Sequence, residues 1–412
     1  MSSPDPICPA ILHNPACTGW VHPFPHFSET SVLYTYLHLS FFLAFLFSNF
    51  PPLPVRFDTF PAPPQAVAFQ TSGAVRDALR GACAGSGGLA RHIEMGKSDE
   101  GRPIDGVQLG HGPRPVSLIA GNHADEPVGP ETLRSFIFSV LDRPDAYAEL
   151  LEAFTFYIVP HTNPDGEARN RPWIEQWPDL AAYLQHVHRE LPGRDLEFGF
   201  PDMRVENQLV ADFLLPQAPF ALHASLHGMS VSEGALLLIN RPWAFRTEAL
   251  QRGYRSAALD AGLGMHDHNR KGEKGFFWIA PGFQTTPRGD AMRSYFRSMD
   301  DEAMAKRFRS SSMEMIMDGG GDPLCLVTEL PLWMLQGGPA DPETTLGEPH
   351  QPHRYNAFRE AFAPLRHANL SGSDSEATIR EALGDFDLEP LDASVAMGLQ
   401  LRALQLALET VG

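Results

Sequence analysis

Two histidines and two glutamates of this 412-residue sequence have the types and surroundings that metal-assisted hydrolysis needs. His123 and Glu126 lie three residues apart in a turn-rich stretch, and His227 follows an apolar run about a hundred residues later. Two imidazoles and one carboxylate leave the fourth position of a zinc ion open, which is the ligand set of catalytic zinc. Glu329, after another apolar run, would supply the general base for a hydrolytic water molecule.

Short apolar runs along the chain predict buried strands that would position these residues. The runs are Pro115–Ala120, Phe154–Val159, Phe220–Leu226, Ala235–Ile239 and Leu324–Thr328. Amphipathic stretches between several of them predict helices, namely Glu131–Leu141, Val205–Leu215 and Ala244–Ala261. Such alternation favours a mainly parallel sheet that is covered on both faces. Ligands of open α/β sheets gather at the carboxyl ends of strands, where we expect the four residues to lie.

Four short motifs occur in order along the chain: Gly-x-His-x-x-Glu, Asn-Pro-Asp-Gly followed by Arg, Leu-His-Gly and Thr-Glu-Leu. Together they resemble the zinc metallocarboxypeptidase family, which also contains aspartoacylase-like and succinylglutamate desuccinylase-like deacylases. Residues 93–104 are similar to the hairpin that precedes the first strand of that family. The resemblance covers roughly residues 90–335 and implies a zinc-carboxypeptidase-like α/β fold, a three-layer α/β/α sandwich around a mixed, mostly parallel sheet.

The resemblance also implies roles for individual residues. His123, Glu126 and His227 would be the ligands of one zinc ion. Glu329 would be the general base and the proton shuttle. Asp125, which lies between two ligands, is expected either to orient an imidazole ring or to cap the helix that follows.

An electrophilic arginine follows the Asn-Pro-Asp-Gly motif in the family and polarises the scissile carbonyl group. Arg169 and Arg171 both fit this description, and the spacing favours Arg171 only slightly. Asn163, the first residue of the motif, is a further candidate for substrate binding.

One segment departs from the family pattern. In carboxypeptidases an Asp-Leu-Asn-Arg-Asn-Phe segment supplies the Asn and the Arg that bind the terminal carboxylate of the substrate. The corresponding stretch here is residues 193–200, in which Glu197 replaces the Asn and Phe198 replaces the Arg. Because a carboxylate would repel the substrate anion, our hypothesis is that Glu197 binds a cationic or amino group instead. The alternative is that Arg194 or Arg204 takes over the anion.

These observations predict a zinc-dependent hydrolase of amide bonds, a metallopeptidase of carboxypeptidase type that acts on peptides. An N-acyl amino-acid deacylase, which would act on acyl amino acids, is the alternative among enzymes. A catalytically silent binding protein with this fold is the alternative outside them. Nucleic acid is excluded as a partner because 50 acidic residues against 32 basic ones give a net charge of −18. The sequence leaves the oligomeric state open.

Three regions of the chain differ in composition. Residues 1–65 are rich in proline and apolar residues and are expected to be a poorly ordered extension, 66–340 to form the catalytic domain, and 341–412 to form helices packed on it. Val32–Phe50 is a 19-residue apolar run, barely long enough to cross a bilayer, so a membrane anchor and a packed element are alternatives. We expect a cytoplasmic protein unless this run is used as an anchor. The C-terminal helices are predicted at Tyr355–His367, Ser375–Leu383 and Ser394–Leu408.

Overall fold

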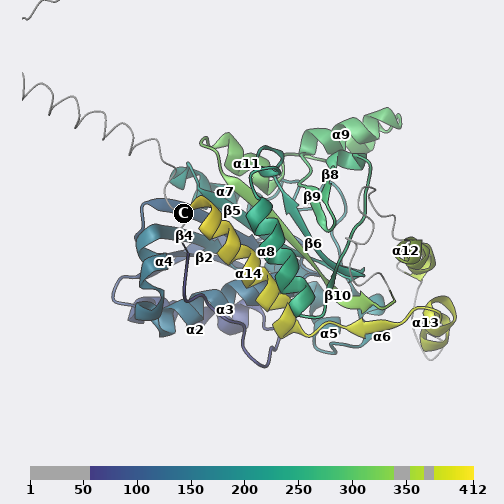
Figure 1. Ribbon diagram of the computed structural model, residues 1–412, viewed down its shortest axis with the longest axis horizontal. Helices are drawn as coiled ribbons and strands as arrows, with labels where there is room; N and C mark the ends of the chain where they lie inside the picture. The colour runs from purple at the N-terminus through teal and green to yellow at the C-terminus, as the bar shows by residue number, and fades with distance from the viewer. Residues whose placement is uncertain (1–55, 338–352, 366–374) are drawn as a thin grey trace, which may run out of the picture. The chain divides into compact units, whose positions relative to one another are not determined.

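The computed structural model describes residues 56–337, 353–365 and 375–412, which form a mixed sheet with helices on both faces (Figure 1). Nine strands follow one another in the order β1-β2-β4-β3-β5-β10-β6-β9-β8, while β11 pairs with β10 and β7 pairs with β6. The strands are β1 (Ala90–Lys97), β2 (Pro103–Leu109), β3 (Arg114–Ala120), β4 (Phe154–Val159), β5 (Leu222–Ser232), β6 (Gly234–Ile239), β7 (Gly264–Met265), β8 (Trp278–Ala280), β9 (Phe283–Thr285), β10 (Leu324–Leu335) and β11 (Leu388–Pro390).

Four neighbouring strands at the centre of the sheet are parallel. Strand β3 pairs with β4 and with β5, and β5 also pairs with β10. The flanking ladders are of both kinds: β1 with β2, β2 with β4, β6 with β10 and β8 with β9 are antiparallel, whereas β6 with β9 is parallel. Every residue of β4 is buried, as expected for a strand covered on both faces. The predicted mixed sheet is therefore confirmed.

Helices cover both faces of this sheet (Figure 1). On one face α3, α8 and α14 pack over a core that contains Leu118 of β3 and Leu404 of α14. On the other face α7 and α11 supply Val210 and Ile316 to a core that contains Ile119 of β3. Because neighbouring residues of a strand point to opposite faces, β3 contributes to both cores, and the predicted three-layer sandwich is confirmed. The helices are α2 (Ser72–Gly85), α3 (Val128–Asp142), α4 (Ala148–Ala153), α5 (Pro164–Ile174), α6 (Leu180–His186), α7 (Val205–Leu214), α8 (Glu248–Asp260), α9 (Gly289–Ser298), α10 (Glu302–Ala305), α11 (Ser312–Asp318), α12 (His353–Leu365), α13 (Ser375–Leu383) and α14 (Ala393–Val411).

Two strands extend further than the apolar runs predict. β5 continues to Ser232 and β10 continues to Leu335, so His227 and Glu329 lie within paired strands and not at strand ends. The expectation that both residues follow their strands is wrong. Pro331 does not end β10 because the ladder with β6 stops at Glu329, and a proline is tolerated where one side of a strand has no partner.

The predicted C-terminal helices are present. α12, α13 and α14 overlap the three predicted stretches, and α14 lies against α8 and α3 (Figure 1). Val32–Phe50, like the rest of residues 1–55, lies outside the described residues, and the predicted domain boundaries stay a prediction. In the part of the chain that the structure describes, no helix is both long enough and apolar enough to cross a membrane.

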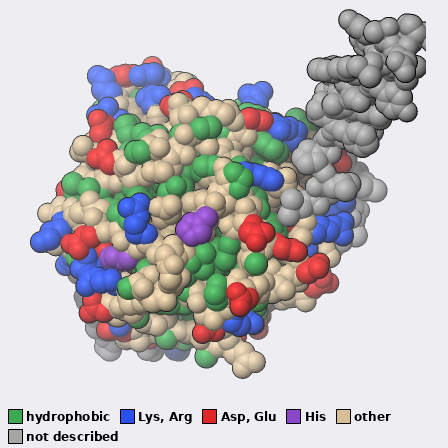
Figure 2. Space-filling view, turned by 90° about the vertical axis from the view of Figure 1, so that its left-hand side faces the viewer, with side chains coloured by type: hydrophobic (Ala, Val, Ile, Leu, Met, Phe, Trp, Pro, Cys, Tyr) green, Lys and Arg blue, Asp and Glu red, His purple; other side chains and the backbone are tan. Residues whose placement is uncertain are grey.

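Charged side chains of both signs are interspersed on the face drawn in Figure 2. Exposed ion pairs join some of the surface charges of the molecule, such as Arg246 with Asp322 at 2.6 Å and Arg297 with Glu302 at 2.9 Å. Pairs of this kind contribute at most about 1 kcal/mol each. The stability of the described residues therefore comes mainly from the two apolar cores between the layers.

Candidate metal centre

The loop between β3 and α3 carries the first two predicted ligands, His123 and Glu126. It begins at Gly121, whose φ of +79° is unfavourable for residues with a side chain. A Cβ atom there would also lie 2.5 Å from Nδ1 of His161, so only glycine fits. The loop ends at Pro127, directly before α3. Both ligands are thus held in a short turn between two packed elements.

His227 comes from the neighbouring strand, β5. Because β5 pairs with β3 on one side and with β10 on the other, His227 lies close to the ligand loop and opposite Glu329 in the ladder. The backbone carbonyl of His227 accepts a hydrogen bond from Nε2 of Gln400 on α14 (3.1 Å). Gln400 in turn accepts one from Oγ1 of Thr132 on α3 (2.6 Å). The last helix therefore supports the strand at the ligand itself.

The three predicted ligands meet in the structure, and we call them the metal-ligand cluster. Nδ1 of His227 lies 3.0 Å from Nδ1 of His123 and 2.8 Å from Oε2 of Glu126. Nδ1 of His123 lies 3.2 Å from Oε1 of Glu126. One ligand atom of each residue lies within 4.8 Å of the other two, and His227 and Glu126 are buried.

Hydrogen bonds on the far side of each imidazole ring determine which nitrogen carries a proton. Nε2 of His123 contacts Asp195 (3.1 Å), and Nε2 of His227 contacts Glu197 (3.1 Å). A ring that holds its proton on Nε2 donates it to that carboxylate and turns the lone pair of Nδ1 toward Glu126, which is the tautomer that a metal ion needs. Two lone pairs and a carboxylate that face one another need a cation between them, and this donor set fits zinc.

Burial and the close approach of charged groups also shift the pKa values of the predicted ligands. Burial and Arg189 lower the pKa of His123, but the carboxylates of Glu126 and Asp195 outweigh both and raise it to about 9. Burial raises the pKa of Glu126, but Arg189 and the two histidines outweigh it and hold that pKa well below its usual range. Without a metal the cluster therefore holds protons on its imidazoles, and a metal ion has to displace them.

Glu329 lies beside the cluster on β10 and is half-buried. Burial and the negative charge of Glu126 raise its pKa to about 7, although His227, His123 and Arg189 oppose this effect. A carboxylate that gains and loses a proton near neutral pH can act first as a general base and then as a general acid. The structure thus brings the predicted base next to the three predicted ligands.

The arginine at the cluster is Arg189, which the motifs did not single out. Its Nη1 atom donates to Glu126 (2.6 Å) and to Asp125 (2.7 Å). Both alternatives predicted for Asp125 are wrong, because its carboxylate binds Arg189, and Pro127 precedes α3 without a side-chain cap. Burial lowers the pKa of Arg189, but the two carboxylates outweigh it and raise it. Arg189 lies just before residues 193–200, so a search ahead of that segment would have found it.

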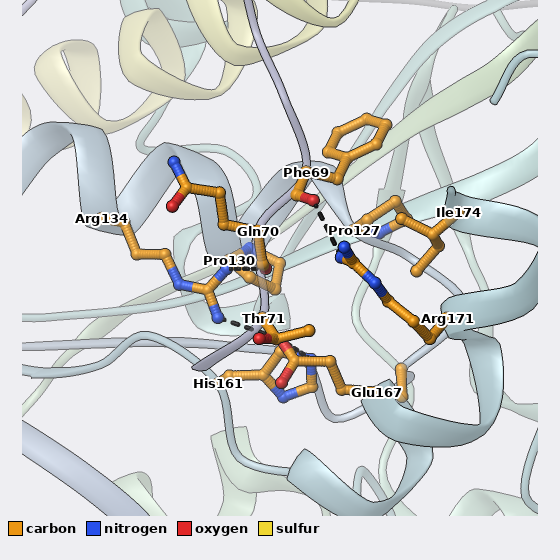
Figure 3. A pocket seen from close by; sticks show the side chains of 11 residues that line it. Phe69, Gln70, Thr71, Pro127, Pro130, Arg134, His161, Glu167, Arg171 and Ile174 are labelled. Atoms are coloured by element: carbon orange, nitrogen blue, oxygen red, sulfur yellow. Dashed lines mark hydrogen bonds and ion pairs between the residues drawn. The ribbon is translucent and has the colours of Figure 1, made fainter. Parts of the chain in front are cut away.

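Arg169 and Arg171 do not contact the metal-ligand cluster, so both predictions of an electrophilic arginine are wrong. Arg169 pairs with Glu100, and Nε of Arg171 donates to Glu175 (2.7 Å). Figure 3 shows Arg171 directed at the carbonyl oxygen of Phe69, to which its Nη1 donates at 3.3 Å. Both side chains are 38% exposed, because α5 begins within the Asn-Pro-Asp-Gly motif, at Pro164, and directs these positions outward.

Asn163 and the two arginines considered for the substrate anion serve the fold instead. Asn163 is buried, and its Oδ1 caps α5 by accepting from the N–H of Gly166 (3.0 Å). Arg194 is 60% exposed at the surface. Arg204 is buried and donates to Glu206 (2.6 Å). Each of these side chains is held by other contacts of the fold, and the predicted roles of Asn163 and Arg194 in substrate binding stay predictions.

Glu197 is buried, and neighbouring donors occupy its oxygens. It accepts from Nδ2 of Asn122 (2.6 Å) and from Oγ of Ser312 (2.7 Å), besides Nε2 of His227. Burial raises its pKa, but His227 and the other hydrogen bonds outweigh burial and lower it to about 2. The hypothesis that Glu197 binds a cationic group of the substrate is wrong, because its carboxylate orients a metal ligand. Phe198 is buried in an apolar cluster.

A second buried group of charges adjoins the ligand loop, and we call it the Arg134 network (Glu131, Arg134, His161 and Glu167). Nη1 of Arg134 donates to Glu131 (2.6 Å), and its Nη2 donates to Glu167 (3.0 Å). Nε2 of His161 lies 3.6 Å from Glu167. In Figure 3, Arg134, His161 and Glu167 line one small cavity, and Ala124 of the ligand loop lines it too. The network therefore supports the loop that carries two ligands.

Comparisons with known proteins agree with the motifs. Residues 78–203 match a family model described as zinc carboxypeptidase. Zinc carboxypeptidase A 1 of Anopheles gambiae is 32% identical over 127 residues, which are 29% of this chain and 29% of that protein. An inactive metallocarboxypeptidase of Ajellomyces capsulatus is 32% identical over 87 residues, or 19% of this chain and 14% of that protein. The match thus spans less than a third of the length of either relative.

A solved structure of bovine thrombin-activatable fibrinolysis inhibitor, in complex with tick carboxypeptidase inhibitor, is 15% identical. The similarity covers 83% of this chain and 97% of that chain, with a TM-score of 0.43. The segment matched by the family model contains His123, Glu126 and Arg189, whereas His227 and Glu329 lie beyond it. The resemblance seen in the motifs is confirmed, and residues 78–203 of this chain are similar to the zinc carboxypeptidases.

Proposed function

We propose that this chain is a zinc-dependent hydrolase of amide bonds and acts as a metallocarboxypeptidase. The observation that supports this most is the meeting of two imidazoles and Glu126 within 4.8 Å, with Glu329 opposite His227 in the ladder. A structural cluster of charges would pair donors with acceptors. Here Asp195 and Glu197 can accept the ring protons on the outer side, so in neutral rings protonated at Nε2 the inner atoms would all be acceptors.

Zinc bound by His123, Glu126 and His227 would supply a Lewis acid that polarises the scissile carbonyl group and lowers the pKa of water. Glu329 takes a proton from the attacking water and returns it to the leaving nitrogen. In the metal-free chain burial and Glu126 raise the pKa of this carboxyl group to about 7, and a carboxylate with a raised pKa is suited to transfer a proton in both directions.

The remaining polar groups orient the reacting atoms. Arg189, next to Glu126, donates to the carbonyl oxygen as negative charge develops there. Asp195 and Glu197 accept the Nε2 protons of the two histidines and so keep both Nδ1 atoms directed inward.

An N-acyl amino-acid deacylase is the second candidate, because Glu197 and Phe198 replace the Asn and Arg with which carboxypeptidases bind the end of a peptide, so the usual peptide subsite is changed. The deacylase chemistry would use the same ligands and the same Glu329. Peptides and acyl amino acids are therefore the two substrate classes to compare.

The test uses the full chain loaded with zinc. We expect one zinc ion per chain by mass spectrometry, and release of free amino acids from a panel of short peptides. Glu329→Gln should keep the zinc and lose about 10²- to 10⁴-fold in kcat, because general acid–base catalysis contributes an effect of this size. Glu302→Gln, which changes an exposed carboxylate of α10, is the matched control.

The outcomes separate the candidates. Faster release from peptides than from acyl amino acids supports a carboxypeptidase, and the reverse order supports a deacylase. Less than one zinc per chain, together with no effect of Glu329→Gln, would overturn the proposal and leave a binding protein with this fold.

A further inference from the structure

Arg270 is a half-buried arginine without a carboxylate partner. Its guanidinium lies over the ring of Phe276, 4.0 Å from the ring centroid. Among the described residues, no carboxylate oxygen lies within 4.0 Å of that guanidinium. Two acids lie three residues from it in sequence: Glu273 pairs with Lys274 (3.2 Å), and Asp267 accepts from Nε1 of Trp278 (2.7 Å). Withdrawing a cation from water without a counter-ion is costly, which marks this position as a place for an anion.

Phe276 holds the guanidinium beside the proposed active site. Its ring packs against Leu236 and Val327. Leu236 faces Glu329 in the ladder between β6 and β10, and Val327 precedes Glu329 by two residues, so it points to the same face of the sheet. Arg270 therefore lies on the sheet face that carries the proposed general base.

The ring of Phe276 also packs against the apolar cluster that contains Phe198 and Phe308. Phe198 stands where carboxypeptidases have the arginine that binds the terminal carboxylate of the substrate. The molecule thus has no cation at that position and holds one, Arg270, over a ring that packs against the same apolar cluster.

Charges of both signs lie near Arg270. Burial, the largest effect, lowers the pKa of Arg270, while Tyr355 and Glu329 raise it. Arg359 adds a second positive charge nearby, with its guanidinium 5.9 Å from the ring centroid of Tyr355. An arginine stays charged at neutral pH in such surroundings, so Arg270 remains an anion receptor beside Glu329.

We propose that Arg270 binds the carboxylate of the substrate, in place of the Asn and Arg that Glu197 and Phe198 replace. This inference rests on the proposed hydrolase function and narrows the substrates to peptides or acyl amino acids with a free carboxylate. A guanidinium that lies over an aromatic ring keeps the N–H groups at the edge of its plane free. Two of these groups can donate parallel hydrogen bonds to one carboxylate. Because the ring already restricts the side chain, little freedom is lost on binding.

The test compares two probes that differ in charge, 3-phenylpropanoate and 3-phenylpropanamide. Each is titrated calorimetrically into the zinc-loaded full chain and into its Arg270→Gln and Arg270→Lys variants. We expect Arg270→Gln to weaken binding of the carboxylate about 10- to 100-fold and to leave the amide unchanged. Arg270→Lys should recover part of the loss, because it keeps the charge. Arg252→Gln, at a 75% exposed side chain of α8, is the matched control.

If zinc alone held the carboxylate, 3-phenylpropanoate would bind to the wild type and to Arg270→Gln with equal affinity. That result would overturn the inference. Unchanged zinc content and circular dichroism show that the variants fold. In turnover, Arg270→Gln should raise KM for benzoylglycyl-phenylalanine and not for its C-terminal amide. Binding of the probes does not require turnover. A wild type that hydrolyses no substrate would overturn the proposed hydrolase function, and the binding of 3-phenylpropanoate would still decide whether Arg270 binds a carboxylate.

Discussion

Two buried groups of charges adjoin the same loop, and they are built differently. In the Arg134 network donors meet acceptors, since Arg134 donates to both Glu131 and Glu167. In the metal-ligand cluster the Nδ1 atoms of both histidines turn toward Glu126 and toward each other, so neutral rings protonated at Nε2 would leave three acceptors facing one another. A buried group of charges that satisfies itself holds the fold, whereas one that does not is a place for a ligand.

Breaking the Arg134 network should affect folding and not the metal. Arg134→Met leaves two buried carboxylates without their cation, and we expect a loss of about 3–5 kcal/mol in the free energy of unfolding. Denaturant unfolding of the metal-free chain measures this loss, and mass spectrometry checks that the zinc content is unchanged. Arg297→Met removes an exposed pair and is the control. A loss below about 1 kcal/mol would show that the network does not hold the fold.

Removing the carboxylate behind a ligand should affect the metal and not the fold. Glu197→Gln weakens the hydrogen bond to Nε2 of His227, and we expect zinc affinity to fall about 10- to 100-fold. Competition with a chromogenic chelator measures the affinity. Glu314→Gln changes another buried carboxylate, which accepts the N–H groups of Gly289 and Ser311, and is the matched control. Equal zinc affinity in both variants would contradict a role of Glu197 at the metal.

The Arg134 network should also be sensitive to acid through His161. Burial lowers the pKa of His161 to about 4, whereas an unfolded chain has a histidine pKa of about 6.5. The stability from neutral His161 is therefore complete above pH 6.5 and is lost as the pH falls toward 4. In the metal-free chain, we expect the wild type to lose about 1–2 kcal/mol more than His161→Gln between pH 7 and pH 4. Parallel stability curves for the two proteins would refute this assignment.

Much of the fold and the metal-ligand cluster could be predicted because their signals are local. The apolar run Phe154–Val159 is β4 without change, and the helical stretch Ser375–Leu383 is α13. His123, Glu126 and His227 each stand in a short motif next to an apolar run, so the sheet that the runs predict brings them together.

The residues that could not be predicted owe their positions to contacts distant in sequence. Arg169 and Arg171 have the expected spacing, but α5 directs both outward. Arg189 reaches Glu126 only because its segment folds back on the ligand loop. Arg270 lies near the proposed base because it stacks on Phe276, whose ring packs against residues of β6 and β10. No sequence motif marks such a contact. The sequence alone predicts that Glu197 contacts substrate, because its partner in the fold, His227, belongs to a later strand and no local pattern joins the two residues.

The hydrogen bonds of Gln400 form late in synthesis, because α14 follows all the predicted metal ligands in the chain. The loop with His123, strand β5 and strand β10 all leave the ribosome before α14 does. Until α14 packs on the sheet, the carbonyl group of His227 and the hydroxyl group of Thr132 lack the amide that joins them. A nascent chain arrested before residue 393 therefore contains His123, Glu126 and His227 without the helix whose Gln400 supports the strand at His227.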